Sequence, residues 1–354
     1  MIEWIHYTQR RKPRQTGKWG AAAPEAEKGE CSECSLHEKG NKTELFHELC
    51  FSTFENYAII RTFHKDRREK PEGREETKEK TAMDKIRRNE RMSAMIKLLS
   101  DTPNRMYTLN DFCARFGSAK STISEDIDAL RQVVKQFDLG EVETVTGAAG
   151  GVLYRPRISR AGALAYIRSL CERLSGSERV LPGDFLYYSD ILSTPQIVNR
   201  MGEIIATEYY GENPDFVLTM ETKGIPVAFA TANALGVPLV IARHTSRVYE
   251  GSAVNINYVS GSGHIETMSL SRRAVKENQR ALIVDDFLRG GGTARGMVDL
   301  MREFNVSVIG TAFVMSTVNP VKKRVSGEKA LMTLEVREGD PAQAVVRPAE
   351  WLMG

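Results

Sequence analysis

One stretch of the chain combines an apolar run, two adjacent carboxylates and a glycine-rich loop. Residues 281–284 (Ala-Leu-Ile-Val) predict a buried strand, and Asp285 and Asp286 follow it directly. The loop after them contains Arg289, Gly290, Gly291, Gly292 and Thr293. Glycine lets backbone N–H groups approach an anion without a Cβ clash, and the helix predicted from Ala294 adds a favourable dipole. Carboxylates repel phosphate but accept hydrogen bonds from vicinal hydroxyls, so the stretch suits a ribose diol beside a 5′-phosphate.

A second loop with anion-binding chemistry follows another predicted strand, over 215–220. Thr222, Lys223 and Gly224 occupy this loop, immediately before a helix predicted over 225–235. The lysine charge and the N–H groups at a helix start would both attract an anion. The alternative is an ordinary surface lysine in a turn.

A third segment, 257–264, is rich in serine and glycine and precedes the apolar–polar stretch 266–270. This composition predicts a hairpin with a mobile tip. His264 lies in that tip, where we expect a solvent-exposed side chain rather than a catalytic base.

The elements around these loops indicate an α/β domain over residues 158–354. Further strands are predicted at 238–242 and 308–315, and further helices at 160–174 and 195–210. Strands that alternate with helices imply a parallel sheet. Such sheets bind ligands at the carboxyl ends of their strands, which is where the first two loops lie.

Residues 83–157 predict a small helical domain that ends in a β-hairpin. Thr108 can cap the second helix, Gly117 can end it, and a third helix follows at once. Two helices joined by a tight glycine turn are typical of a helix-turn-helix. The strands predicted at 142–146 and 152–154 would form its wing.

The third helix of this domain carries small polar and basic side chains on its outward N-terminal face. A recognition helix needs such residues where it meets base edges and phosphates in the major groove. We expect DNA contacts from Lys120, Ser121, Thr122 and Ser124, with Arg87, Arg88 and Arg91 of the first helix on phosphates. The acids Glu125, Asp126 and Asp128 would be repelled by DNA, so only the first turn could enter the groove. A solvated helix face is the alternative.

Composition sets the frame for these domains. The chain has 354 residues and a net charge of +3, which is too small to diagnose a nucleic-acid-binding protein by itself. Its five cysteines are irregularly spaced, unlike a secreted disulfide framework, and no apolar run approaches the roughly 18 residues of a membrane span. We therefore expect no membrane association and a cytoplasmic, nucleoid-associated protein.

Residues 1–82 differ from the rest, because their apolar residues are scattered and 65–80 is nearly all charged. Such a segment cannot bury enough surface to offset its ordering entropy, so we expect a disordered or non-native N-terminal extension. Cys31, Cys34, His47 and Cys50 have the spacing of zinc ligands. Little core surrounds them, so we expect no metal site, with zinc as the open alternative.

The stretch 281–293 closely resembles the phosphoribosyl pyrophosphate (PRPP) motif of type I phosphoribosyltransferases. In that family the acidic pair binds the ribose hydroxyls and the glycine–threonine loop binds the 5′-phosphate. The loop that corresponds to 222–224 binds pyrophosphate, and a hairpin like that around 257–264 is the hood over bound PRPP. A glycine-rich turn without this role is the alternative for the motif alone.

A winged helix joined to such a domain resembles the purine operon repressors of Gram-positive bacteria. The matching motifs lie at 118–121, 123–126, 147–152, 222–226, 256–262 and 285–287, and the resemblance covers 83–330. It implies a homodimer that binds double-stranded operator DNA and represses purine genes, with PRPP as an inducer that weakens DNA binding. Guanosine tetraphosphate could compete for the same pocket, and Mg²⁺ could accompany PRPP. No catalytic residue and no required cofactor are implied.

The sequence departs from this family in three places. Arg289-Gly290 stands where a lysine and an alanine are expected, residues after Pro320 follow the family only loosely, and 1–82 has no counterpart. The main alternative is an active purine phosphoribosyltransferase with a DNA-binding head. Arg289 speaks against its 6-oxopurine branch, where an acid in that loop handles the base proton. A third alternative is a PRPP-binding regulator that acts on enzymes through protein contacts. Such a regulator would need no winged helix.

Overall fold

The computed structural model describes residues 86–147, 150–183, 185–246, 249, 251–260, 263–339 and 341–354. The predicted N-terminal extension, with Cys31, Cys34, His47 and Cys50, lies outside these residues. Its predicted disorder and the open zinc alternative therefore stay as predictions.

The first part of the described chain is a three-helix unit with a β-hairpin wing. Its elements are α2 (Arg88–Asp101), α3 (Leu109–Phe116), α4 (Lys120–Gln136), β1 (Glu141–Val145) and β2 (Gly151–Arg155). As predicted, Thr108 caps α3 by accepting the N–H of Asp111 at 3.2 Å, and Gly117 ends the helix in the left-handed region at φ 60°. The predicted helix-turn-helix and wing are therefore confirmed as structure.

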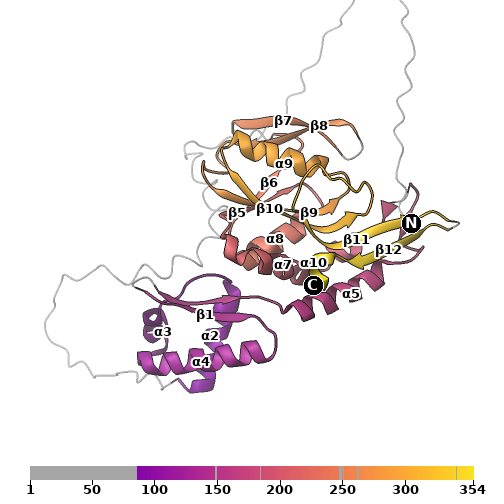
Figure 1. The fold of residues 1–354 in the computed structure, drawn as a ribbon. Coiled ribbons are helices and arrows are strands. Elements are labelled where there is room, and N and C mark those ends of the chain that lie inside the picture. The colour runs from indigo at the N-terminus through magenta and orange to yellow at the C-terminus, as the bar shows by residue number, and fades with distance from the viewer. Residues whose placement is uncertain are drawn as a thin grey trace, which may run out of the picture. The chain divides into compact units, whose positions relative to one another are not determined.

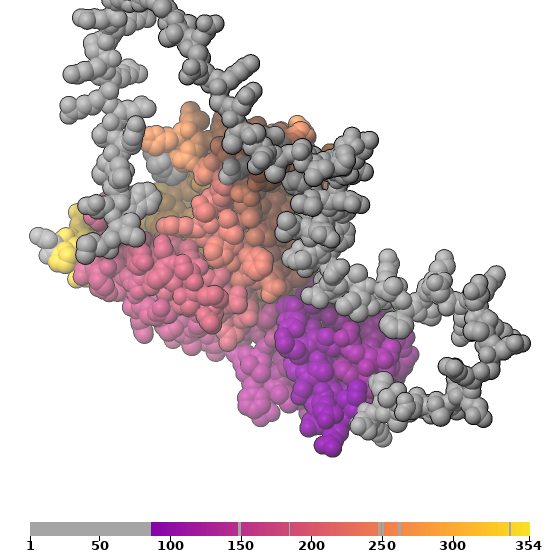
Figure 2. Space-filling view, turned by 180° about the vertical axis from the view of Figure 1, so that it is seen from behind, coloured from indigo at the N-terminus to yellow at the C-terminus, as the bar shows by residue number. Residues whose placement is uncertain are grey.

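These helices share one apolar core. Met95, Leu99 and Ile123 are completely buried, and Phe112 stacks on Phe116 with 6.2 Å between ring centroids. Val152 brings the wing onto the same core. The surface of this part of the chain forms one continuous body, indigo to purple in Figure 2.

The second part is built on a six-stranded sheet, as the predicted α/β class requires. The strands run in the order β12 (Gln343–Pro348), β11 (Lys329–Arg337), β10 (Ser307–Thr317), β9 (Arg280–Leu288), β5 (Phe216–Met220) and β6 (Leu239–Ala242). All neighbours pair in parallel except β11 and β12, which are antiparallel. The strands read as apolar runs because both faces of the sheet are covered.

Different elements cover the two faces (Figure 1). One face packs against α5 (Arg160–Leu174), α6 (Ser189–Leu192), α7 (Pro195–Tyr209), α8 (Ile225–Leu235) and α10 (Glu350–Met353). The other packs against α9 (Gly292–Glu303) and the hairpin β7 (Ala253–Val259) and β8 (Ile265–Ser271). Short elements complete the part: β3 (Val180–Leu181), β4 (Phe185–Leu186) and the 3₁₀ turn η1 (Tyr210–Glu212).

Two expectations about strands need correction. The strand predicted over 281–284 continues through Asp285 and Asp286 to Leu288, because β10 pairs with it over this whole length. No element was predicted beyond residue 315, where the structure has β11, β12 and α10. Within the residues that the structure describes, no helix is both long and apolar enough to cross a membrane.

Candidate functional site

The two predicted anion loops lie side by side because their strands are neighbours in the sheet. β5 and β9 pair in parallel, with Leu218 opposite Ile283. From β5 the chain continues to β6 on one side, whereas from β9 it continues to β10 on the other. A parallel sheet opens a ligand crevice at such a reversal, at the carboxyl ends of the strands. The loops 221–224 and 289–291 border that crevice.

The acidic pair is divided between the strand and the crevice. The Asp285 side chain is buried, and its Oδ1 accepts the backbone N–H of Asp286 at 3.0 Å. Burial, together with the charge of Asp286, raises the pKa of Asp285 well above its ordinary value. Asp286 is only half-buried, so it is the more accessible acceptor of the two.

The pyrophosphate loop predicted from the sequence packs directly onto Asp285. A Cβ on Gly224 would overlap Asp285 Oδ1 and would lie 2.6 Å from Thr219 Oγ1, so only glycine fits there. Thr222 and Lys223, by contrast, are exposed. The structure thus brings Thr222, Lys223 and Gly224 together with the acidic pair.

One aromatic side chain, which no sequence motif marks, touches both halves of this arrangement. The Tyr188 hydroxyl donates to Asp286 Oδ2 at 2.6 Å, and Lys223 Nζ lies 5.1 Å from the centroid of the Tyr188 ring. Tyr188 itself is buried. It precedes α6, in a segment for which the sequence predicted no element, and 98 positions separate it from Asp286.

The glycine-rich loop leads into α9 as expected for an anion site. Gly291 has φ 79° and caps the helix, whose first internal bond runs from Arg295 N to Gly291 O at 2.9 Å. The N–H groups of 292–294 precede this bond, so no carbonyl of the helix accepts them, which is the arrangement that binds anions at helix starts. Thr293 is half-buried and Arg289 is exposed.

A segment after β10 supports this loop, and we call residues 318–328 the strap. Lys323 Nζ donates to Arg289 O at 2.6 Å and to Thr317 O at 2.7 Å. Arg324 donates its backbone N–H to Gly290 O at 3.1 Å and Nη1 to Val259 O at 3.2 Å. These contacts could not be predicted from the sequence, because the strap has no helical or strand periodicity.

The predicted hood hairpin is present as β7 and β8. Its Tyr258 packs against α9, where a Cβ on Gly296 would lie 2.9 Å from Tyr258 Cγ. The Tyr258 hydroxyl donates to Glu266 Oε2 at 2.8 Å. His264 is exposed, as predicted. Gly261 and Ser262 at the tip lie outside the described residues, so the mobility of the tip stays a prediction.

The candidate DNA-binding side chains gather at the start of α4. Lys120, Ser121 and Ser124 are exposed there, and Thr122 is half-buried. Asp126, which we expected on the outward face, is instead completely buried. The first turn of α4 therefore presents basic and hydroxyl groups, although Glu125 is exposed beside them.

Arg91 is a correction to the predicted phosphate contacts. Its side chain is only 7% exposed, and Nε donates to Asp126 Oδ2 at 2.6 Å. Opening this pair for a DNA phosphate would leave the buried Asp126 carboxylate without its counter-charge, so Arg91 instead links α2 to α4. Arg88 also reaches Asp126, at 3.0 Å, but its side chain stays 60% exposed, and Arg87 is exposed. These two arginines remain candidates for phosphate contacts.

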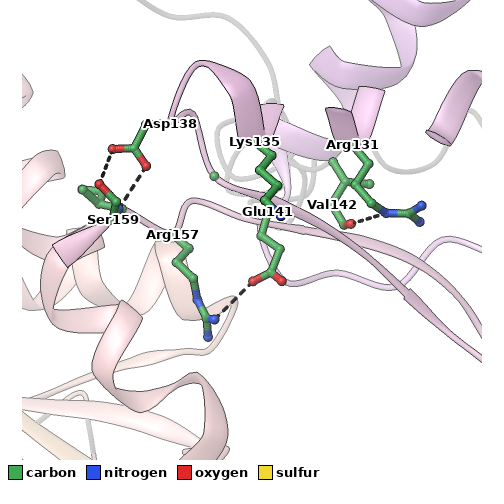
Figure 3. A pocket seen from close by; sticks show the side chains of 9 residues that line it. Arg131, Lys135, Asp138, Glu141, Val142, Arg157 and Ser159 are labelled. Atoms are coloured by element: carbon green, nitrogen blue, oxygen red, sulfur yellow. Dashed lines mark hydrogen bonds and ion pairs between the residues drawn. The ribbon is translucent and has the colours of Figure 1, made fainter. Parts of the chain in front are cut away.

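A separate pocket of about 330 Å³ lies between the end of α4 and the start of α5 (Figure 3). Its polar groups bond to one another: Arg157 to Glu141 at 3.3 Å, and Ser159 Oγ to Asp138 at 2.7 Å. None of the predicted effector residues lines this pocket. Its internal pairing is that of a structural junction between the two parts.

Potential metal ligands are scattered over the part of the chain that the structure describes. Among those residues, no group of three or more His, Cys, Asp or Glu side chains is placed to hold a metal ion. The acidic pair supplies two carboxylates, which is fewer than a protein-only site for Mg²⁺ requires.

Comparison with known proteins divides the chain at the same place as the fold. Residues 87–156 match the family described as bacterial purine repressor, N-terminal, and residues 188–346 match the phosphoribosyl transferase domain. The probable purine biosynthesis transcriptional regulator PurR of Streptococcus pneumoniae is 43% identical over 250 residues, which cover 70% of this chain and 91% of that protein.

Two further relatives carry more specific names. The purine biosynthesis transcriptional repressor PurR of Bacillus subtilis is 41% identical, over 71% of this chain and 88% of that protein. The purine biosynthesis transcriptional activator PurR of Lactococcus lactis subsp. lactis is 38% identical, over 71% of this chain and 93% of that protein. With both domains matched in order and relatives matched over nearly their whole length, the chain belongs to the bacterial purine repressor (PurR) family of transcriptional regulators.

Proposed function

We propose that this protein represses purine genes by binding operator DNA through its winged helix, and that PRPP binds the crevice and weakens that binding. The observation that carries the proposal is the convergence at the β5–β9 crevice. Gly224 packs on Asp285 there, and α9 begins at Gly292, directly after the loop that follows β9. A ribose diol, a 5′-phosphate and a pyrophosphate each have a matching group.

The roles of the individual residues follow from this arrangement. Asp286 and Asp285 accept the ribose hydroxyls, with Asp286 as the more accessible of the two. The loop with Arg289, Gly290, Gly291, Gly292 and Thr293 binds the 5′-phosphate, while Thr222, Lys223 and Gly224 bind the pyrophosphate. Mg²⁺ would reach the site with the pyrophosphate, and guanosine tetraphosphate would compete because it also carries a ribose between phosphates.

The DNA side of the proposal rests on α4 and α2. Lys120, Ser121, Thr122 and Ser124 enter the major groove, and Arg87 and Arg88 contact phosphates. A homodimer would present two such helices to paired half-sites about one helical turn, ~34 Å, or a multiple apart.

We further propose that the protein binds PRPP without turning it over. The loop position that handles a base proton in 6-oxopurine transferases is Arg289 here, and a guanidinium accepts no proton near neutral pH. Incubation with PRPP and adenine, guanine, hypoxanthine, xanthine or uracil should release no pyrophosphate above background. Nucleotide synthesis with any base would favour the alternative, an active phosphoribosyltransferase with a DNA-binding head.

One titration tests both the direction of the PRPP effect on DNA binding and the location of the PRPP site. The purified protein is titrated on operator DNA with and without PRPP, beside an Asp285→Ala variant. PRPP should release the parent, whereas the variant should hold the operator at the same PRPP concentration. Each charge-assisted bond contributes on the order of 1.5–3 kcal/mol, which is roughly tenfold to a hundredfold in affinity.

Other results would overturn the proposal in distinct ways. If PRPP tightened DNA binding, the proposed role of PRPP as an inducer that releases the operator would be wrong. If Asp285→Ala responded like the parent, the inducer site would lie elsewhere.

A further inference from the structure

We propose that Tyr188 is a positioning residue of the effector site, which holds the Asp286 carboxylate and the Lys223 ammonium in the geometry that PRPP requires. The proposal rests on the function proposed above and adds a residue that no motif of the sequence marks. In this proposal the single side chain of Tyr188 contacts both the ribose end and the pyrophosphate end of the crevice.

The first argument is that Tyr188 is fixed. Its side chain is only 7% exposed and belongs to the core that covers one face of the sheet. Its ring stacks on Phe287, with 6.0 Å between the ring centroids and 25° between the planes. The next residue, Ser189, begins α6, which packs on α7. The hydroxyl therefore occupies a defined point that a ligand could displace only by disturbing the core.

The second argument concerns Asp286. A carboxylate has two acceptor oxygens, and the bond from Tyr188 uses Oδ2. With Oδ2 held, the orientation of Oδ1 is set before a ribose hydroxyl arrives, so binding costs less side-chain entropy. Burial raises the pKa of Tyr188, so the phenol remains a donor throughout the physiological range.

The third argument concerns Lys223. This side chain is exposed, and a free lysine would have many rotamers to lose when it binds pyrophosphate. Its ammonium instead lies 5.1 Å from the centroid of the Tyr188 ring, within the range of a cation–π interaction. The Tyr188 ring thus holds the Lys223 ammonium near the crevice, while the Tyr188 hydroxyl holds the Asp286 carboxylate in place.

A double-mutant cycle tests the role of the hydroxyl. PRPP binding is measured by calorimetry for the parent, Tyr188→Phe, Asp286→Ala and the double variant. Phenylalanine keeps the ring, its stacking on Phe287 and its contact with Lys223, and removes only the hydroxyl. Tyr188→Phe should weaken PRPP binding roughly threefold to tenfold, the range expected when one side chain must be ordered on binding. In the Asp286→Ala background the same change should have no effect, because the hydroxyl acts through that carboxylate.

A ring-deleting variant tests the second contact. Tyr188→Leu should weaken PRPP binding further than Tyr188→Phe, because Lys223 then loses the ring. Thermal unfolding of each variant checks that the fold is kept, and operator affinity without PRPP should equal that of the parent.

The outcomes separate this inference from the proposed function. If Tyr188→Phe binds PRPP as the parent does, the hydroxyl does not position Asp286. The same conclusion follows if the change weakens PRPP binding equally in the parent and in the Asp286→Ala variant. Tighter binding by Tyr188→Phe would show that the hydroxyl competes with the ribose, which also overturns the inference. If the parent itself shows no PRPP binding, the proposed function fails as well.

Discussion

Asp285 is a carboxylate held where its charge is unfavourable. It is buried beside Asp286, and both burial and that neighbour raise its pKa. A folded-state pKa above the unfolded value means that the folded protein binds the proton more tightly than the unfolded chain does. The associated stability is present below the unfolded pKa, about 3.9, and is lost as the pH rises through the folded pKa.

Asp285→Asn should therefore stabilise the ligand-free protein at neutral pH while it weakens PRPP binding. Asparagine carries no charge to bury, and its carbonyl can still accept the N–H of Asp286, as Asp285 Oδ1 does at 3.0 Å. Each 1 kcal/mol gained would raise the unfolding midpoint by about 2–4 °C for a domain of this size. The midpoints of variant and parent are compared from pH 4 to pH 8, and the gap should close toward acid pH. A gap that is independent of pH would contradict the account of Asp285.

The residue types of the effector site could be predicted because each motif is local. The acidic pair and both loops directly follow strands that read as apolar runs, so order along the chain is enough. Tyr188 and Lys323 could not be predicted, since their partners lie 98 and 34 positions away. The phosphate contact predicted for Arg91 has the same weakness, because its buried partner Asp126 comes from another helix and could not be foreseen from the sequence.

At the scale of elements, the first turn of α4 makes a specific prediction about DNA. Lys120→Ala should weaken operator binding, and the slope of log affinity against log salt should become less negative by about 0.9 for each bound protomer, because each loses one neutralised phosphate. Lys135→Ala is the matched control, because Lys135 is an exposed lysine in the last turn of the same helix. Both are measured by operator titration over a salt series. If Lys120→Ala and Lys135→Ala weakened operator binding equally, the first turn of α4 would not be the recognition surface.

The strap makes a second prediction at this scale. Lys323 Nζ donates to Arg289 O, Thr317 O and Thr317 Oγ1, and burial lowers the pKa of its ammonium. Lys323→Met should release the phosphate loop and weaken PRPP binding by roughly tenfold, the value of about one charged hydrogen bond. The exposed neighbour Lys322 is the control, since Lys322→Met removes the same charge without these bonds. If both variants had equally reduced affinity, net charge rather than loop support would be responsible.

Helices and strands differed in how well the sequence predicted them. α5 and α8 have the predicted bounds, because periodicity and end residues agree: Ser159 caps α5, and Gly236 ends α8 with φ 68°. The strands β11 and β12 were missed, because a short apolar run such as 330–332 does not distinguish a strand from a buried helix. β11 is a strand because it pairs with β10, and β12 because it pairs with β11; both pairings belong to the tertiary structure.

At the scale of the whole described chain, several contacts join the winged helix to the effector domain. One is the Arg155 guanidinium of β2, which lies 5.1 Å from the centroid of the Tyr210 ring. The N–H and hydroxyl of Ser159, at the start of α5, donate to Asp138 at the end of α4, at 3.1 and 2.7 Å (Figure 3). Asn104 Nδ2 donates to Leu235 O at 2.8 Å, at the end of α8. The other end of α8 is Gly224, which packs on Asp285. A single, mostly buried helix thus connects the predicted pyrophosphate loop to the DNA-binding domain.

Asn104 is tied into the winged helix as well. Its Oδ1 accepts Nε of Arg155 at 3.0 Å, and its backbone N–H donates to Tyr154 O at 2.7 Å, both on β2. A shift of α8 would therefore reach the wing through this amide side chain, and also through Tyr210, whose hydroxyl donates to Ala234 O on α8 at 3.2 Å and whose ring contacts Arg155. PRPP can change DNA affinity only by its differential affinity for the two forms of the protein, so such a contact is where that difference can be transmitted.

Asn104→Gly should uncouple the two sites and leave each of them intact. Glycine is the suitable replacement because Asn104 has φ 58°, which alanine would adopt only with strain. Operator affinity without PRPP and PRPP affinity without operator should match the parent, while the factor by which PRPP weakens DNA binding should fall toward one. Coupling is reciprocal, so saturating operator must weaken PRPP binding of the parent by that same factor, and of the variant by less. Calorimetry with PRPP, in the presence and absence of operator, measures both. A variant with the full parental factor would place the coupling elsewhere, in the contact of Asp138 with Ser159 or in that of Arg155 with Tyr210.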